Sequence, residues 1–447
     1  MDMFVRPTRV RGLHPTVGAL VFLAASCAPA AASVAQQTPD VDRALVERVI
    51  NTLASDDMGG RDAYSPYAVR AAEFLAREFA AAGLQSPAGA ENYLQRFSTR
   101  TLTAGEGRVI VNGRPLFPNQ IAMRLGGGSI NWRTGDVPVI IVGPDDDVLT
   151  TVTSVANAGF DALVLIDEAH REGFGSLVQI FRRPVRVLSD AVGAAVVLGL
   201  VTAGPDATYQ VSHTASDVME PIANVVGVLP GRRTDEFVLF SSHYDHIGFE
   251  RPLFGDSIGN GANDDASGTA AVVALAKHFA ARGTPERTLL FAAFTAEEAG
   301  GFGSRHYSRQ LDADQIVAMF NIEMIGKPAA SGPNTAWITG FDQSTFGQIV
   351  QQAANGTGYR FVADPYPSYR LFSRSDNVTL ARLGVPAHSI STTPIDTDPD
   401  YHRVSDEVAT LDMAHLVSTI RAIARAAETI VSGAATPTRV DPATVEN

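Results

Sequence analysis

Residues 243–268 place two imidazoles and several carboxylates between a predicted strand and a predicted helix. The continuous apolar run 237–240 predicts a buried strand, and residues 269–281 carry apolar side chains at helical spacing. Open α/β sheets hold their functional sites beyond the carboxyl ends of their strands, which is where such a loop lies. The rest of the chain must therefore fold so that it completes a polar site at this edge.

The pair His243 and Asp245 suits a metal site. One nitrogen of a ligating imidazole binds the ion, while the other donates to a carboxylate that fixes the tautomer. We therefore predict His243 as a metal ligand and Asp245 as its hydrogen-bond partner. Asp264 and Asp265 stand at the predicted helix start, where one acidic residue serves as a cap. Capping does not explain the second Asp.

From residue 216 onward, strands alternate with helices, which predicts an α/β fold: a mixed, mostly parallel sheet sandwiched by helices. The expected strands are 237–240, 288–294, 317–322, 336–339 and 387–391. Glu297 with Glu298, then Glu323, follow successive strands, and His402 lies in a later loop. A single Glu pair is usually a solvated face or a helix first turn. Acidic residues that recur at the ends of successive strands instead indicate one shared site.

Five segments differ in character. Residues 1–35 predict a signal peptide, and residues 36–100 contain two amphipathic helices, at 41–54 and 66–83, joined by a polar loop whose acids we expect to be solvated. Residues 101–215 consist of short β-rich pieces and predict a smaller inserted domain. Residues 216–432 form the main core, and residues 433–447 predict a flexible tail.

The first segment has the three parts of a secretory signal. Arg6, Arg9 and Arg11 precede an apolar run, 17–25, that is too short to span a bilayer. Two processing sites compete. Cleavage after residue 35 follows the rule of small residues, whereas a weak lipobox-like sequence would leave a lipid anchor on Cys27. Both predict an exported protein, periplasmic or secreted.

The composition of the chain limits the kinds of molecule that it can bind. The chain has a formal net charge of −13, which argues against nucleic acid and anionic membrane surfaces. Cys27 is the only cysteine, so no intramolecular disulfide can form. After the first segment no apolar run is long enough to span a membrane. The sequence leaves the oligomeric state open.

Five ordered motifs resemble those of the exported bacterial di-zinc aminopeptidases, in the superfamily of glutamate carboxypeptidase II, the glutaminyl cyclases and the transferrin receptor. The motifs are HYDHIG, NGANDDASGTA, FTAEEAGGFGS, NIEMIG and DYHRVSDE. The resemblance covers residues 216–430 and extends more weakly to 41–100, and residues 101–215 resemble a protease-associated domain. It implies the zinc-peptidase fold and an enzyme that removes N-terminal, apolar residues from peptides.

The same resemblance implies two zinc ions per chain. Asp264 would bridge them, because two closely spaced cations need a shared carboxylate to offset their repulsion. His243 and Glu323 would complete one site, and Glu298 and His402 the other. The ligand at Glu323 is commonly Asp in the family, so the longer side chain leaves the geometry there open.

Two further roles come from the resemblance. Glu297 would be the general base, and Tyr401 resembles a family Tyr that hydrogen-bonds the oxyanion of the reaction. Asn377 stands where many relatives have His, and we leave it out of the site.

Other functions on this scaffold are a carboxypeptidase, a glutaminyl-peptide cyclotransferase with one zinc, and a non-catalytic binding protein. The intact ligands and Glu297 count against the last. An aminopeptidase needs acceptors for the substrate ammonium, and a carboxypeptidase needs an Arg for the terminal carboxylate. The candidate acceptors are Asp376, Asp398 and Asp400, and the candidate arginines are Arg305, Arg374 and Arg403.

The export hypothesis predicts the N-terminus of the native protein. We expect mass spectrometry to find a mature chain that begins near Gln36, or at a lipidated Cys27, outside the cytoplasm. An intact, cytoplasmic form that begins at Met1 would contradict both processing routes.

Overall fold

The computed structural model describes residues 40–191, 193–253 and 255–446. The predicted signal peptide and Cys27 therefore lie outside the described residues. The two expected N-terminal helices are α1 (Arg43–Leu53) and α2 (Pro66–Ala81). Asp42 caps the first by accepting from the Leu45 amide, and Ser65 caps the second by accepting from Ala68.

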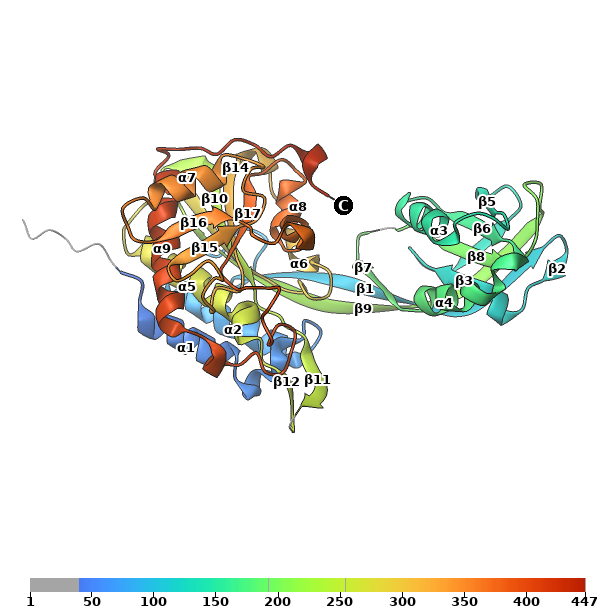
Figure 1. Cartoon of the computed structure of the whole chain (residues 1–447), viewed down its shortest axis with the longest axis horizontal. Helices are drawn as coiled ribbons and strands as arrows, with labels where there is room; N and C mark the ends of the chain where they lie inside the picture. The colour runs from blue at the N-terminus through green and yellow to red at the C-terminus, as the bar shows by residue number, and fades with distance from the viewer. Residues whose placement is uncertain (1–39, 192, 254, 447) are drawn as a thin grey trace, which may run out of the picture. The chain divides into compact units, whose positions relative to one another are not determined.

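Eleven of the described strands form one mixed sheet, in the order β16-β15-β17-β14-β10-β13-β9-β1-β2, with β4 paired to β9 and β7 to β1 (Figure 1). Their bounds are β1 (Leu94–Val111), β2 (Arg114–Pro115), β4 (Ile130–Arg133), β7 (Val185–Leu188), β9 (Tyr209–Leu229), β10 (Arg233–His243), β13 (Arg287–Phe294), β14 (Ile316–Ile322), β15 (Thr335–Ile338), β16 (Arg360–Ala363) and β17 (Ala387–Ser391). The neighbours β17, β14, β10 and β13 are parallel, whereas β15 and β9 join this centre antiparallel. All five expected strands are present.

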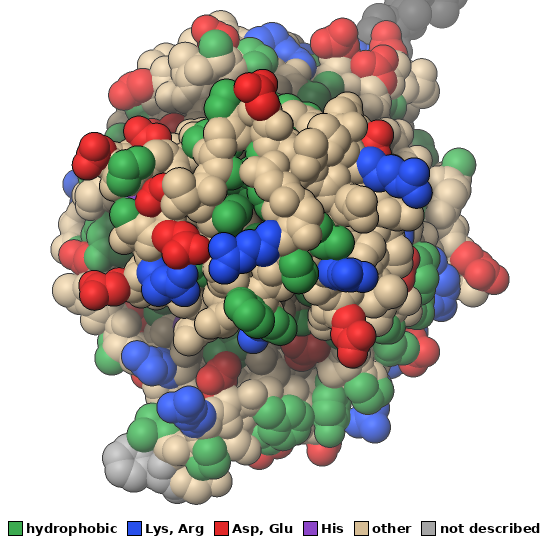
Figure 2. All heavy atoms as spheres, turned by 90° about the vertical axis from the view of Figure 1, so that its right-hand side faces the viewer, with side chains coloured by type: hydrophobic (Ala, Val, Ile, Leu, Met, Phe, Trp, Pro, Cys, Tyr) green, Lys and Arg blue, Asp and Glu red, His purple; other side chains and the backbone are tan. Residues whose placement is uncertain are grey.

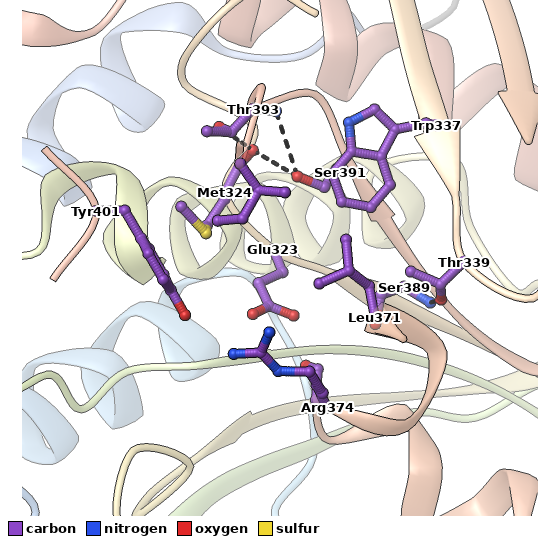
Figure 3. A pocket seen from close by; sticks show the side chains of 12 residues that line it. Glu323, Met324, Trp337, Thr339, Leu371, Arg374, Ser389, Ser391, Thr393 and Tyr401 are labelled. Atoms are coloured by element: carbon purple, nitrogen blue, oxygen red, sulfur yellow. Dashed lines mark hydrogen bonds between the residues drawn. The ribbon is translucent and has the colours of Figure 1, made fainter. Parts of the chain in front are cut away.

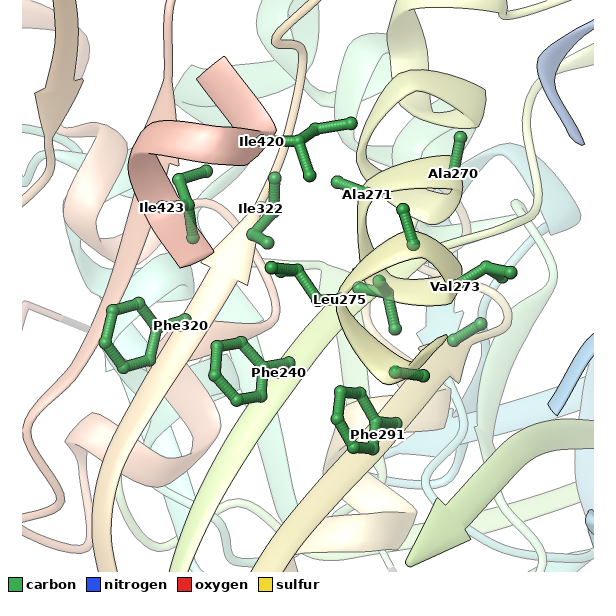
Figure 4. Packing of buried hydrophobic residues seen from close by; sticks show 14 of the residues in the cluster. Phe240, Ala270, Ala271, Val273, Leu275, Phe291, Phe320, Ile322, Ile420 and Ile423 are labelled. Atoms are coloured by element: carbon green, nitrogen blue, oxygen red, sulfur yellow. The ribbon is translucent and has the colours of Figure 1, made fainter. Parts of the chain in front are cut away.

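Helices cover both faces of this sheet. Successive residues of β10 alternate between them: Phe240 packs in the cluster that contains α5 (Ser267–Ala280) and α9 (Met413–Val431), and Leu239 packs on the opposite face with α8 (Asn377–Ala381). The first cluster also contains residues of α1, α2 and α7 (Phe346–Ala353), and α6 (Phe302–Ser308) belongs to the second. Figure 4 shows Phe240, Phe291 and Phe320 on neighbouring strands beside Leu275 of α5. The predicted α/β sandwich is confirmed.

The parallel centre fixes where the site lies. His243 is level with Phe294 of the neighbouring strand, so the loops after β10 and β13 leave the same edge of the sheet. The loop after β14 leaves this edge too, because β14 is parallel to β10. After β10 the chain forms a hairpin, β11 (Gly248–Leu253) and β12 (Asp256–Gly259), before it reaches the start of α5.

The predicted insertion contains a second sheet with the order β3-β8-β6-β5. Its strands are β3 (Ile121–Arg124), β5 (Val139–Val142), β6 (Ala162–Ile166) and β8 (Val196–Leu200). One face packs against α3 (Val148–Asn157) and α4 (Arg171–Phe181), and the other packs against residues of β1, β4 and β9. The segment therefore has apolar clusters of its own on both faces of a small sheet.

No linker separates this segment from the main sheet at its ends. β1 and β9 pair without leaving the strand conformation from Leu94 opposite Val225 to Val111 opposite Tyr209, with one irregularity between Ala104 and Gly107. The predicted boundaries at 101 and 215 thus fall inside continuous strands.

The expectation of a flexible tail is wrong for the described residues 433–446. Arg439 donates to the backbone oxygens of Ala313 and Ile316, and Val440 and Val445 are buried in the cluster that contains α8. A few buried contacts are enough to order a short segment, and they cannot be read from its Thr- and Pro-rich composition.

Among the described helices, none is long and apolar enough to cross a bilayer. On the face drawn in Figure 2, acidic and basic side chains are interspersed and neither sign dominates.

Candidate metal centre

Side chains from five segments meet at the carboxyl edge of the parallel strands. His243, Asp245 and His246 come from the end of β10 and the loop after it, and Asp264 comes from the segment before α5. Glu297 and Glu298 lie in the loop after β13. Glu323 lies in the loop after β14, and His402 lies in the loop after β17. Every metal ligand predicted from the sequence is therefore brought to one place.

Asp264 is the common member of two groups. Ligand atoms of His243, Asp264 and Glu323 all lie within 4.8 Å of one another, and so do those of His246, Asp264 and Glu298. The Nε2 atom of His243 is 3.2 Å from one carboxylate oxygen of Asp264. This is the arrangement expected of a carboxylate that bridges two ions.

The second group has two candidate imidazoles. His402 Nε2 lies 3.3 Å from Asp264 Oδ2 and 3.2 Å from Glu298 Oε2. His246 Nδ1 lies 2.9 Å from Glu298 Oε1, and its ring is buried. Our sequence reasoning gave His246 no role, although its place three residues after His243 in the same loop was the available signal.

The residues present fit divalent metal ions. His243 Nε2 and His246 Nε2 are buried and have no hydrogen-bond partner within the described protein. Buried polar atoms without partners are costly, and imidazole nitrogens with carboxylate oxygens are the donors that Zn²⁺ takes in proteins. An ion in the group of His243, Asp264 and Glu323 would satisfy His243 Nε2, and ions in both groups would offset the negative charge.

Burial disfavours ionisation of Asp264, but contacts from His243 and His402 outweigh it and hold the pKa of this carboxyl well below its usual range. Burial alone would lower the pKa of His402, whereas its contacts with Asp264 and Glu298 raise it to about 10. Without ions, protonated imidazoles therefore supply the positive charge that the carboxylates need.

The pKa values of three other acids are raised instead of lowered. Burial raises the pKa of Glu323 to about 7 and that of Asp376 to about 6. The pKa of Glu297 is raised well above its usual range by burial and by the neighbouring charges of Asp376 and Glu323, against the effect of His243. Glu297 thus binds a proton more readily than an exposed carboxyl does.

Asp245 supports two neighbours. His243 Nδ1 lies 3.2 Å from the Asp245 backbone oxygen and 3.9 Å from its carboxylate, so the carbonyl is the closer partner of the imidazole. The carboxylate instead accepts from the backbone N–H of Glu297 at 3.2 Å. Asp245 therefore connects the loop of His243 with the loop of Glu297.

Asp265 and Asp406 hold the backbone around Asp264. Asp265 accepts from the amides of Gly268 and Met324, at 2.9 and 3.0 Å, so capping explains this member of the Asp pair. Asp406 accepts from the amides of Asn263 and Asp264, at 2.9 and 3.0 Å. Asp406 has no part in our sequence-based site, because a loop acid gives no sign of its partners.

Arg61 lies buried near the carboxylates, although the sequence predicts an exposed loop here. Its guanidinium donates to four backbone oxygens, those of Leu53, Tyr244, Asn260 and Gly261, at 2.5 to 3.0 Å. Gly60 precedes it with a φ of +66°, and a Cβ there would meet backbone oxygens at 2.5 and 2.6 Å. The glycines before Arg61 thus allow the backbone to bring the Arg61 guanidinium between the loops that carry the site residues.

A pocket of about 50 Å³ adjoins the centre (Figure 3). Glu323, Tyr401 and Arg374 are among the residues that line it. The Tyr401 ring stacks on His402 with 4.0 Å between ring centroids, and burial raises the pKa of its phenol. Tyr401 therefore keeps its proton and can act as a hydrogen-bond donor beside the centre.

One oxygen of each of Asp398 and Asp400 is engaged by a lysine, which counts against the expectation that they bind a substrate ammonium, and only the Oδ2 atom of Asp398 is buried without a partner among the described residues. Lys327 Nζ lies 2.5 Å from Asp398 Oδ1 and 2.8 Å from Asp400 Oδ2. Asp376 differs, because both of its buried oxygens lack a hydrogen-bond partner among the described residues. Asn377 donates to the Phe372 and Ala387 carbonyls and is structural, consistent with leaving it out of the site.

Solved structures share this architecture. The chain superimposes on the aminopeptidase from Aneurinibacillus sp. strain AM-1 with a TM-score of 0.53, at 17% identity, covering 92% of this chain and 97% of that one. A zinc aminopeptidase from Bacillus subtilis gives a TM-score of 0.54 at 16% identity, with 90% and 98% covered. The fold is therefore that of the zinc aminopeptidases.

Sequence comparison gives relatives for the main core. Leucine aminopeptidase 1 of Trichophyton rubrum is 27% identical over 214 residues, which are 43% of this chain and 54% of that protein. Leucine aminopeptidase 1 of Ajellomyces capsulatus (strain H88) is 26% identical over 211 residues, 43% of this chain and 52% of that protein. The chain thus spans about half the length of these curated relatives.

Residues 224–427 match the profile of peptidase family M28. These matched residues contain every ligand group described above.

Lys327 joins the loop that carries Glu323 to the loop that carries His402. The Lys327→Met variant leaves Asp398 and Asp400 without their cation, and breaking a buried ion pair costs about 3–5 kcal/mol. We expect a lower thermal unfolding temperature and fewer zinc ions retained per chain after dialysis, measured by calorimetry and elemental analysis.

The matched control is Lys277→Met, at the only other lysine of the sequence. Lys277 forms an exposed ion pair with Asp42, so we expect little change. Equal zinc retention in the two variants would contradict the role given to Lys327.

Proposed function

We propose that this protein is a zinc-dependent exopeptidase, an aminopeptidase that removes N-terminal residues from peptides. The single observation that carries the proposal is the sharing of Asp264 by two ligand groups, with the raised pKa of Glu297 beside them. A pair of metal sites next to an acid–base group is the apparatus of two-metal hydrolysis.

In this proposal two zinc ions bind per chain. His243, Asp264 and Glu323 hold one, and Asp264, Glu298 and His402 hold the other. When bound, the ions would supply the Lewis acidity that activates water and polarises the scissile carbonyl. His246, which faces Glu298, orients that carboxylate or adds a further ligand.

Glu297 is the proposed general base. It takes a proton from the attacking water and passes it to the leaving amine, a task that suits a carboxyl whose pKa is raised. Tyr401 donates from its phenol to the oxygen that becomes negative, and Asp245 positions Glu297 through the backbone.

Two observations favour removal of N-terminal residues. The relatives with sequence similarity include leucine aminopeptidases, and Asp376 has two buried oxygens, without a hydrogen-bond partner among the described residues, that can receive a substrate ammonium. A carboxypeptidase and a glutaminyl-peptide cyclotransferase on the same scaffold remain the alternatives.

We further propose that residues 101–215 are an inserted domain of the protease-associated kind, which the separate apolar clusters of this segment support. Export, with a signal peptide in residues 1–35, is also proposed, and it rests on the sequence pattern alone.

The Glu297→Gln variant separates proton transfer from metal binding. We expect it to keep its zinc and to lose activity by on the order of 100- to 10,000-fold, the usual effect of removing a general base. His243→Ala and His402→Ala should instead lose zinc, as measured by elemental analysis, whereas His170→Ala in the inserted segment serves as the control. Near-normal turnover by Glu297→Gln would remove Glu297 from the mechanism.

The end of the peptide that is cut can be tested on one leucyl peptide in three forms. We expect cleavage when the amine is free, little cleavage when it is acetylated, and undiminished cleavage when the C-terminus is amidated, because the ammonium would need its acceptors. Chromatographic product analysis measures each rate. Cleavage that survives acetylation, or that is lost only on amidation, would exclude the aminopeptidase assignment.

A further inference from the structure

The pocket beside the metal centre has the size of one side chain. Its volume is about 50 Å³, so the pocket has room for a small group and not for a longer peptide segment. Its apolar walls are Met324, Trp337, Leu371, Ile395 and Tyr401. Since Glu323 also lines it, the pocket would receive the substrate side chain next to the scissile bond, if the proposed function holds.

The hydroxyl groups of the pocket are engaged by the protein itself. Ser391 and Thr393 both donate to the Met324 carbonyl, bonds that Figure 3 marks with dashed lines. Ser375 accepts from Asn321, Ser389 donates to Asn377, and Thr339 accepts from the Ser389 amide. These hydroxyls therefore serve the packing of the pocket and offer little to a ligand.

Arg374 is different, because its guanidinium has no hydrogen-bond or ion-pair partner among the described residues. It forms no side-chain hydrogen bond, and no carboxylate of the described residues lies within 4.0 Å of it. In the view of Figure 3 it extends toward the side of the pocket where the Glu323 carboxylate lies. The Trp337 indole N–H, another donor in the wall, is buried and also without an acceptor.

An uncommitted cation and an unpaired donor favour a negatively charged ligand. A guanidinium can hold a carboxylate with two hydrogen bonds, and such charge-assisted bonds are about twice as strong as neutral ones. Glu323 does not compete for this cation in the proposed function, because it holds a zinc ion there. The apolar walls suit the methylene part of the same side chain.

We infer that Arg374 is a specificity-determining residue, and that the pocket selects substrates whose first residue is acidic. This inference rests on the proposed function. It differs from the apolar first residue that the sequence led us to expect, because that expectation came from the resemblance and took no account of which arginine faces the pocket. An aspartyl side chain has the same number of non-hydrogen atoms as a leucyl side chain, so charge and not size would decide.

The test compares aspartyl, asparaginyl and leucyl p-nitroanilides, which match in size and differ in charge or polarity. We expect the aspartyl substrate to have the highest kcat/KM. Arg374→Met should lower the aspartyl-to-asparaginyl ratio about tenfold, a value at the low end for a charged hydrogen bond because Arg374 is exposed to solvent. Arg374→Glu should turn the preference toward a lysyl substrate.

Arg370→Met is the matched control. Arg370 lies on the same loop, is exposed and pairs with Glu446 at 3.3 Å, so its loss should leave the ratio unchanged. An unchanged ratio in Arg374→Met would overturn the inference. It would also be overturned if that variant slowed only peptides with a free C-terminal carboxylate, because Arg374 would then hold the chain end.

Binding of the products separates this inference from the proposed function. Calorimetric titration of the zinc-loaded protein with L-aspartate and with L-leucine needs no turnover. Tighter binding of aspartate, lost in Arg374→Met, supports the pocket assignment even if no peptide is cleaved, whereas preferred binding of leucine by the unmodified protein overturns it.

Discussion

The structure depends on how buried negative charge is tolerated at one edge of the sheet. Asp264 lies within 4.8 Å of Glu298 on one side and of Glu323 on the other, and the separate ionisation of these acids in a dry site would cost far more than a folded protein can supply. The imidazoles face them from above the edge, and Arg61 lies among the backbone carbonyls of the adjacent loops. Bound zinc would offset the remaining negative charge, and the carboxylates would then serve as its ligands.

The same charges also define the loops. Asp265 and Asp406 hold the amides around Asp264, Asp245 holds the amide of Glu297, and Lys327 holds Asp398 and Asp400. Apart from the bond between Asp265 and Gly268, each contact joins two segments that are distant in sequence. The ligand positions are therefore fixed by a network of polar contacts and not by the strands alone, which explains how long flexible side chains such as Glu323 can be placed reproducibly.

Residues 101–215 join the main sheet without a linker at either end. Strands β1 and β9 continue from the main sheet into this segment, and its small sheet packs apolar residues on both faces. A composition shift at residue 101 marks the change of character, but hydrogen-bonded strands continue across it. A change in amino-acid composition along a sequence therefore marks where the packing partners of a strand change. It does not mark where the strand ends.

The sequence by itself determined the strands and the sandwich, through local periodicity. The resemblance of its motifs to a known family implied the proposed ligands His243, Asp264, Glu298, Glu323 and His402. Only the tertiary structure decided the burial of Arg61, the position of His246 and the engagement of Asp398 and Asp400 by Lys327. It also decided the packing of the C-terminal segment and the free guanidinium of Arg374 in the pocket. The reason is physical: a charged side chain acts through whichever partner lies within a few ångströms, and that partner is set by long-range chain contacts that have no local pattern.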